Sequence, residues 1–192
     1  MPIKKSIFKF VNILKTKLKD VLIIEPDVFP DNRGYFSEFY NKQKLKACGF
    51  DHDFIQDNIA SSTKGVLRGL HYQKGESSQA KLVSVLEGEI FDVCVDIRKN
   101  SPNYGKWEGF LLSESNKKQL FVPKGFAHGY LVISERSRVF YKVDNKYDKQ
   151  SEAGLAYNDS SLNINWNEYY KGGLILSEKD IEWPSLNEIE PQ

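Results

Sequence analysis

The chain has 192 residues, of which 40% are hydrophobic and 28% are charged, and its formal net charge is +1. This composition is typical of a single globular domain and excludes a largely disordered chain. The small net charge gives no general electrostatic attraction to nucleic acid or to a membrane surface. The two cysteines, Cys48 and Cys94, are too few for a disulfide framework, and their spacing matches no zinc motif. We therefore expect a cytoplasmic protein with reduced thiols.

Residues 1–20 form a basic N-terminal extension in which apolar residues such as Leu14 and Leu18 recur at helical spacing. We expect a helix that packs on the domain or on a neighbouring subunit. A helix lying on a membrane surface is the alternative. Lys9 and Lys15 interrupt the apolar run, so the segment does not read as a secretory signal. No stretch approaches about 18 consecutive apolar residues, so we expect no transmembrane segment.

Residues 21–192 are predicted to form one mainly β domain. Turn residues fall every ten or so positions, which favours a sandwich or barrel over βαβ units. One short helix is predicted at Asn41–Ala47, ending at Gly49, and residues 158–192 are expected to cover the barrel with loops and short helices. The predicted strands are Val21–Ile24, Tyr35–Tyr40, Phe54–Asn58, Val66–Gln73, Lys81–Leu86, Ile90–Ile97, Trp107–Leu112, Gln119–Val122, Gly129–Ile133 and Arg138–Val143.

Two of these strands allow a more detailed prediction. Lys81–Leu86 and Ile90–Ile97 flank the turn-like residues Glu-Gly-Glu at 87–89, so the pair is predicted to form a hairpin. In the second strand, apolar residues such as Phe91 and Val93 alternate with Asp92 and Asp96. This period of two indicates a strand with one buried face and one solvent-exposed face.

The chain contains three histidines. His52 lies in a polar connection and is expected to be a solvated surface residue. His71 lies in the otherwise apolar stretch GVLRGLHYQ, and His128 follows a turn in VPKGFAHG. In cupin proteins the latter position is often a metal ligand, commonly together with an H-x-H pair. Here Gln73 stands two residues after His71, so that pair is missing, and we predict a hydrogen-bonding or anion-binding role for His128 without a metal.

Polar and charged residues recur inside otherwise apolar strands, and because buried charges are costly unless paired, they predict one shared polar cavity. A jelly-roll barrel that is open at one mouth provides such an interior. Arg68 and His71 are three residues apart, so a regular strand would point them to opposite faces; a bulge near Gly69 would bring them together. The set comprises Arg33, Glu38, Gln56, Asn58, Arg68, Lys81 and Tyr141, with His71.

Several motifs occur in a fixed order along most of the chain. They are DNRGYFSEFY, QDNIASSTKGVLRGLHYQ, KLVSVLEGEIFDVCVDIRKNSPNYGKW, QLFVPKGFAHGYLV, FYKVDNKY and LSEKD. From about Val21 to Trp183 the chain resembles the dTDP-4-dehydrorhamnose 3,5-epimerase family of isomerases. The resemblance implies a double-stranded β-helix (a cupin-like jelly roll) with short peripheral helices. It also implies a homodimer, a nucleotide-diphosphate sugar as substrate, and no metal or organic cofactor.

The resemblance also implies roles for individual residues. His71 would be the base that removes a proton from the sugar, and Asp180 would pair with it and stabilise the imidazolium. Tyr141 would return a proton from the opposite face, and Lys81 would stabilise the enolate at the C4 oxygen. The positions that would hold the sugar or the nucleotide diphosphate are Arg33, Glu38, Gln56, Asn58, Arg68, His128, Tyr147, Glu152 and Lys179.

This residue set suits epimerisation beside a ketone. A 4-keto group acidifies the hydrogens on C3 and C5, and the resulting enolate needs a nearby donor or cation. The expected activity is C3 and C5 epimerisation of dTDP-4-dehydro-6-deoxy-glucose to dTDP-4-dehydro-rhamnose, a polysaccharide precursor. The sequence leaves open an epimerase that inverts only C3 or C5, and one that uses another nucleotide sugar, including a GDP-linked heptose. A 3,4-ketoisomerase, a metal-dependent cupin oxygenase and a non-catalytic sugar-nucleotide binder are the remaining alternatives.

Overall fold

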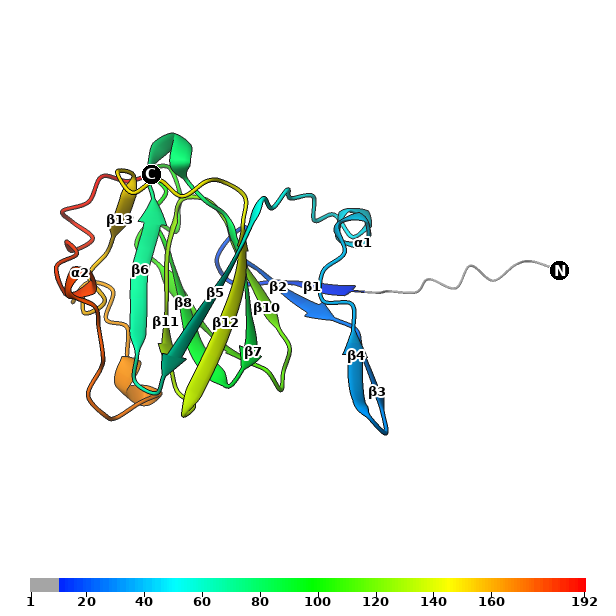
Figure 1. The fold of residues 1–192 in the computed structure, drawn as a ribbon. Coiled ribbons are helices and arrows are strands. Elements are labelled where there is room, and N and C mark those ends of the chain that lie inside the picture. The colour runs from blue at the N-terminus through cyan, green and yellow to red at the C-terminus, as the bar shows by residue number, and fades with distance from the viewer. Residues whose placement is uncertain (1–10) are drawn as a thin grey trace.

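The protein folds into two antiparallel β-sheets that lie face to face (Figure 1). This computed structural model describes residues 11–192. Within them, one sheet has six strands in the order β1-β2-β10-β7-β12-β5, and the other has five in the order β13-β6-β11-β8-β9. The strands of the six-stranded sheet are β1 (Val11–Lys15), β2 (Leu22–Pro26), β10 (Gln119–Val122), β7 (Lys81–Glu87), β12 (Arg136–Val143) and β5 (Gln56–Thr63). Those of the five-stranded sheet are β13 (Glu152–Gly154), β6 (Leu67–Gln73), β11 (Phe126–Val132), β8 (Glu89–Asp96) and β9 (Trp107–Ser113).

Short peripheral elements complete the described chain. Helix α1 (Lys42–Ala47) begins after Asn41, whose side chain accepts a hydrogen bond from the backbone N–H of Lys44 at 3.1 Å. It ends near Gly49, which has a φ of +89°. The predicted helix is therefore confirmed. The remaining elements are the hairpin β3 (Val28–Asp31) and β4 (Gly34–Ser37), the 3₁₀ helices η1 (Gly75–Ser77) and η2 (Trp166–Glu168), and helix α2 (Glu178–Ile181).

The predicted mainly β, jelly-roll class is confirmed, but the predicted hairpin at residues 81–97 is wrong. Strand β7 pairs with β10 and β12, whereas β8 pairs with β11 and β9 in the other sheet. The chain therefore crosses from one sheet to the other at Gly88. A Cβ at Gly88 would lie 1.9 Å from the carbonyl oxygen of Arg136, and its φ is +77°, so only glycine fits this crossing.

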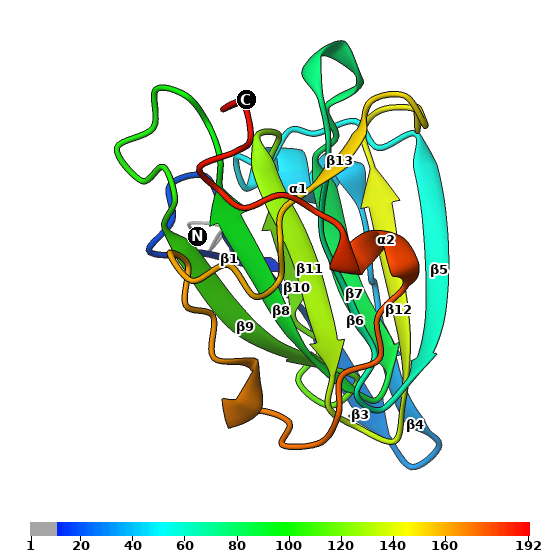
Figure 2. The ribbon, with the colours of Figure 1, turned by 90° about the vertical axis from the view of Figure 1, so that its left-hand side faces the viewer.

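Strand β8 is buried on both faces, so the prediction of a half-exposed strand is wrong. Its Phe91 and Val93 pack beneath the C-terminal segment, whereas Cys94 packs between the two sheets. Asp92 and Asp96 are both fully buried. The face that carries Asp92 is buried because it points between the two sheets, and the C-terminal segment runs across the outer face of the five-stranded sheet as expected (Figure 2).

Residues 11–20 do not form the helix that was predicted for residues 1–20. Strand β1 pairs antiparallel with β2, from Val11 opposite Pro26 to Lys15 opposite Leu22. Pairing satisfies the backbone groups of β1, and Val11 is buried in a cluster on the outer side of the six-stranded sheet. Residues 1–10 lie outside the described part. No helix within residues 11–192 is long and apolar enough to cross a membrane.

Candidate active site

A bulge in β6 decides which side chains reach the interior. His71 lies opposite His128 on β11, and Arg68 lies opposite Tyr130, so two residues of β6 face one residue of β11. Gly69 has a φ of +138°, and a Cβ there would lie 2.5 Å from the Cα of Gly129 on the facing strand β11. Arg68 and His71 consequently line the same cavity. The bulge predicted near Gly69 is confirmed.

The cavity lies between the two sheets and has a volume of about 230 Å³. Its polar lining includes Arg68, His71, His128, Tyr130 and Glu152 from the five-stranded sheet, Lys81 and Tyr141 from the six-stranded sheet, and Lys179 from α2. An adjoining recess of about 320 Å³ shares several of these residues and adds Gln56, Asn58 and Tyr147. Ten of the thirteen predicted site residues therefore line this cavity or its recess, and Asp180 joins them through its contact with His71.

His71 forms an ion pair with Asp180, which lies behind it on α2. The distance from Nε2 to Oδ1 is 2.5 Å, and the side chains are 25% and 4% exposed. Burial raises the pKa of Asp180, but the hydrogen bond and attraction of the His71 imidazole, together with hydrogen bonds from Ser177 and Trp183, outweigh it and lower that pKa overall. Asp180 is therefore a carboxylate at neutral pH, able to hold a protonated or neutral imidazole.

A second pair, His128 and Asp92, forms the floor of the cavity. His128 Nε2 lies 2.8 Å from Asp92 Oδ1, and the side chains are 8% and 0% exposed. Burial lowers the pKa of His128, and the Asp92 carboxylate opposes this shift only in part. His128 is thus a neutral hydrogen-bonding group at pH 7. Asp92 was missed at the sequence level because its place on the polar face of an alternating strand was interpreted as solvent exposure.

Lys81 on β7 and Tyr141 on β12 face the cavity from the six-stranded sheet, opposite His71 on β6. Burial lowers the pKa of Lys81 to about 8, although the Asp92 carboxylate favours the charged form. Burial also raises the pKa of Tyr141, and the nearby Arg68 and Lys179 cations offset this only in part. At neutral pH the cavity therefore holds an ammonium group and a protonated phenol.

The mouth of the cavity carries a cluster of polar residues. Lys179 Nζ donates to Glu152 Oε1 at 2.5 Å, and the hydroxyl of Tyr147 donates to Glu152 Oε2 at 3.2 Å. In the adjoining recess the Gln56 amide donates to the Asn58 side chain at 2.9 Å. These groups surround the entrance, where the more extended part of a ligand would lie.

Arg33 and Glu38 are not brought to this cavity. Arg33 lies in the turn of the β3–β4 hairpin, which projects from the body of the molecule (Figure 1). Its side chain is 84% exposed and pairs with Asp31 at 2.5 Å. Glu38 follows β4 and pairs with Lys44 at 2.7 Å. Both side chains are held by neighbours in sequence, away from the other predicted site residues.

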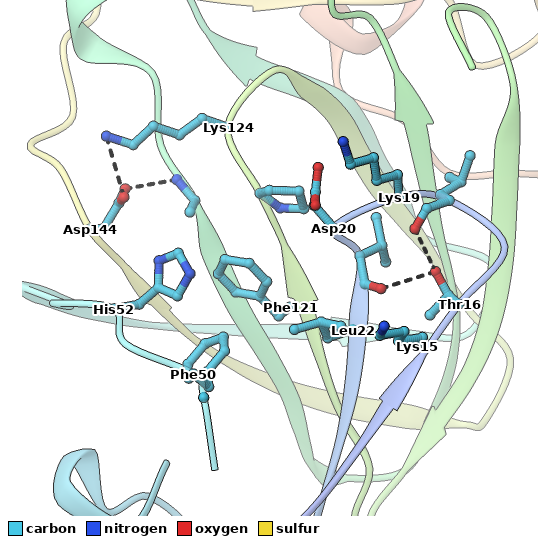
Figure 3. A pocket seen from close by; sticks show the side chains of 15 residues that line it. Lys15, Thr16, Lys19, Asp20, Leu22, Phe50, His52, Phe121, Lys124 and Asp144 are labelled. Carbon is cyan, nitrogen blue, oxygen red and sulfur yellow. Dashed lines mark hydrogen bonds and ion pairs between the residues drawn. The ribbon is translucent and has the colours of Figure 1, made fainter. Parts of the chain in front are cut away.

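A larger cavity, of about 750 Å³, lies between the β1–β2 connection and the loop after α1 (Figure 3). His52 packs there against Phe121, with ring centroids 4.4 Å apart, and is half-buried rather than solvated as predicted. Lys124 pairs with Asp144 at 3.3 Å. None of the predicted site residues lines this cavity, and its single histidine faces aromatic rings rather than a carboxylate.

Comparison with known proteins identifies the family of the chain. A family model described as dTDP-4-dehydrorhamnose 3,5-epimerase matches residues 15–188. The chain belongs to this family. It is 48% identical over 180 residues to the dTDP-4-dehydrorhamnose 3,5-epimerase of Escherichia coli, which covers 93% of this chain and 96% of the relative.

Solved structures of the epimerase family agree with this fold. The dTDP-4-dehydrorhamnose 3,5-epimerase of Elizabethkingia anophelis is 51% identical with a TM-score of 0.86, covering 93% of this chain and 97% of that one. A Legionella pneumophila epimerase in complex with dTDP-4-keto-L-rhamnose is 44% identical with a TM-score of 0.88, covering 94% and 95%. In the present chain, two motifs that suggested the epimerase family meet in space, because RGLHYQ supplies His71 and LSEKD supplies Asp180.

Proposed function

We propose that this chain epimerises C3 and C5 of a dTDP-4-dehydro-6-deoxy-hexose, giving dTDP-4-dehydro-L-rhamnose for polysaccharide biosynthesis. The observation that carries this proposal is the pairing of His71 with Asp180 on one side of a cavity whose other side carries Tyr141 and Lys81. A base and an acid on opposite sides are what inversion of a carbon centre requires. Membership of the epimerase family supports the same conclusion.

His71 is the base in this proposal. Asp180 accepts a hydrogen bond from Nε2, so Nδ1 keeps the lone pair that takes a proton from the carbon next to the ketone. The carboxylate fixes this tautomer and stabilises the imidazolium that forms. Histidine suits the role because its ordinary pKa is close to neutral pH.

Lys81 and Tyr141 complete the reaction. Removal of the proton leaves an enolate, and the ammonium group of Lys81 would stabilise its oxygen in a partly water-excluded cavity. Tyr141 is protonated at neutral pH because burial raises its pKa. It would deliver a proton to the opposite side of the same carbon and so invert the centre. Once His71 has released its proton to water and Tyr141 has taken one back, repeating the cycle at the second α-carbon gives the 3,5-epimer.

The remaining predicted residues are proposed to hold the substrate. Arg68 and Lys179 are the cations that suit a pyrophosphate, because both donate to its oxygens. His128 would hydrogen-bond to the ligand as a neutral imidazole. The other positions proposed to contact the sugar or the nucleotide are Gln56, Asn58, Tyr147 and Glu152.

We further propose that the enzyme is a homodimer in which the β3–β4 hairpin contacts the partner. The hairpin exposes Phe29, Tyr35 and Phe36 at 52%, 59% and 67%, an apolar surface of the kind that marks a protein interface. Arg33 and Glu38 would then bind substrate in the partner's cavity. A mixed dimer of the inactive variants His71→Ala and Arg33→Ala tests this, because one of its sites would be intact only if Arg33 acts across the interface.

The cytoplasm is the proposed location. Cys48 and Cys94 are both free thiols in the structure, and Cys48 is exposed. An exposed thiol persists in a reducing compartment and would be prone to oxidation outside it. Labelling of Cys48 in protein taken directly from lysed cells, before and after reduction, checks this.

The decisive experiment is incubation with dTDP-4-keto-6-deoxyglucose in deuterated water, with NMR detection of exchange. Deuterium at both C3 and C5 is the expected result. Exchange at one position alone would identify a single-site epimerase. No exchange with any 4-keto nucleotide sugar would sink the enzymatic proposal.

A further inference from the structure

Trp183 lies next to the His71–Asp180 pair but belongs to none of the motifs that suggested the epimerase family. Its indole N–H donates to Asp180 Oδ1 at 3.3 Å, the same oxygen that accepts from His71. The indole and imidazole rings meet edge to face, with centroids 6.1 Å apart and planes at 74°. The same carboxylate oxygen thus accepts from two donors on different segments, in addition to the hydrogen bond that Ser177 gives the carboxylate.

The indole ring is itself held in place by the backbone of β13. A Cβ at Gly154 would lie 2.3 Å from Cδ2 of Trp183, so the ring lies flat against this glycine. Gly154 is the partner of His71 in the β13–β6 ladder. Together with Gly154, Trp183 also lines an outer groove of about 410 Å³. Asp180, which accepts from the indole, does not line this groove and is 3% exposed.

We propose that Trp183 is a positioning residue for the His71–Asp180 pair. Its N–H fixes the carboxylate that orients the imidazole, and its ring keeps water of the outer groove away from that carboxylate. This inference rests on the proposed function, in which His71 is the base. The hydrogen bond from Trp183 also contributes to the lowered pKa of Asp180. It withdraws charge from the carboxylate and so moderates how strongly Asp180 stabilises the imidazolium.

The test uses Trp183→Phe, which keeps an aromatic ring and removes the donor. The control is Trp166→Phe, because Trp166 also donates its indole N–H, to the carbonyl of Tyr157 at 2.8 Å, and lies outside the cavity lining. The His71 titration is followed by NMR of the imidazole nitrogens in the free protein, with His71→Asn assigning the signal. Removing the donor leaves more charge on the Asp180 carboxylate, which then favours the imidazolium, so the titration of His71 should move to higher pH than in the wild type and in Trp166→Phe.

A second variant disturbs the contact between Trp183 and Asp180 without changing either residue. Gly154→Ala places a methyl group where the indole lies, so it should displace Trp183 and raise the His71 pKa in the same direction. For both variants the acid limb of kcat/KM should move upward by the same amount, and kcat at the optimum should fall about threefold to tenfold. The other ionisable groups around His71 are unchanged in all variants; they are Arg68, Lys81, His128, Tyr130, Tyr141, Glu152 and Lys179.

Coincident His71 titrations in Trp183→Phe, Gly154→Ala and the Trp166→Phe control would overturn the inference, even if stability or kcat had fallen. The NMR titration needs no substrate. Its outcome is therefore independent of the deuterium-exchange experiment, and failure of the proposed function is distinguishable from failure of the role of Trp183.

Discussion

The protein contains two His–Asp pairs a short distance apart, on neighbouring strands, and their surroundings make them chemically different. His71 is 25% exposed and pairs with a carboxylate 109 residues away in sequence. His128 is 8% exposed and pairs with a carboxylate on the adjacent strand β8. Burial lowers the pKa of His128, whereas the carboxylate of the first pair is held ionised by several hydrogen bonds. The same pair of residue types thus provides a proposed base at His71 and a neutral hydrogen-bonding group in the cavity wall at His128.

The difference shows that access to the cavity, and not the presence of a carboxylate, separates the two histidines. The bulge at Gly69 lets His71 reach the cavity, where its side chain is 25% exposed. His128 lines the same cavity but stays in the regular ladder between β11 and β8, and its side chain is only 8% exposed. Variants at the two pairs and at their neighbours should therefore differ widely in their effects.

Replacing His71 should have the largest effect. His71→Asn removes the base and should lower the rate of deuterium exchange at C3 and C5 by about 10³-fold or more, because general base catalysis contributes roughly 10²–10⁴-fold. His52→Asn is the matched control, since His52 packs on Phe121 outside the site. Exchange by His71→Asn at the wild-type rate would remove His71 from the mechanism.

Replacing each aspartate by asparagine compares the contributions of the two pairs to catalysis and stability. Asp180→Asn should lower kcat by about 10²–10³-fold, because the amide cannot stabilise an imidazolium. Asp92→Asn should lower kcat by about tenfold or less and should mainly reduce thermal stability, since a fully buried hydrogen-bonded carboxylate is replaced. Steady-state kinetics and melting temperatures of both variants decide the matter. Equal losses of kcat would mean that the second pair is also catalytic.

The pKa of Lys81 predicts a basic limb in the pH profile. Burial lowers this pKa to about 8, so the ammonium form needed at the enolate is lost as the pH rises through about 8. We expect kcat/KM to decline by about tenfold for each further pH unit. Lys81→Arg stays charged over this range, so its residual activity should lack the limb. An unchanged limb in that variant would assign it to another group.

The smallest expected effect is the contribution of His128 to the pH dependence of folding stability. The folded-state pKa of His128 lies below the ordinary value of 6.5, because burial disfavours the charged ring. The unfolded chain therefore binds a proton more readily, and stability that is fully present above about pH 6.5 is lost as the pH falls below it. Urea unfolding between about pH 5.5 and 7.5 should show a shallower decline in His128→Gln than in the wild type. The same slope in both proteins would contradict this reading of His128.

Much of the fold and the site could be predicted from the chain itself. Period-two patterns and regular turns indicated a sandwich or barrel, and the helical stretch Asn41–Ala47 with Gly49 after it indicated α1. The conflict between Arg68 and His71 on one strand, together with a glycine between them, indicated the bulge. These features are local, because they depend on backbone preferences and on the alternation of side chains within a few residues.

Other features depended on which segments meet in three dimensions. The alternating strand β8 was predicted to be half exposed, yet the C-terminal segment covers its outer face, and its inner face, which carries Asp92, packs between the two sheets beside His128. The strands on either side of Gly88 look like a hairpin in sequence, but each joins a different sheet. Residues 11–15 have a helical pattern, and the available edge of β2 makes them a strand.

For this protein, the sequence by itself determined the residue types of the site, the motif order that the epimerase family shares, and the local irregularity at Gly69. Only the tertiary structure decided that Trp183 supports the Asp180 carboxylate and that Arg33 and Glu38 lie outside the cavity, whereas the pairing of Asp180 with His71 was already implied by the family resemblance. The physical reason is that these contacts join segments far apart in the chain, and their choice depends on how the sheets and the C-terminal segment pack. Local preferences carry no information about that packing.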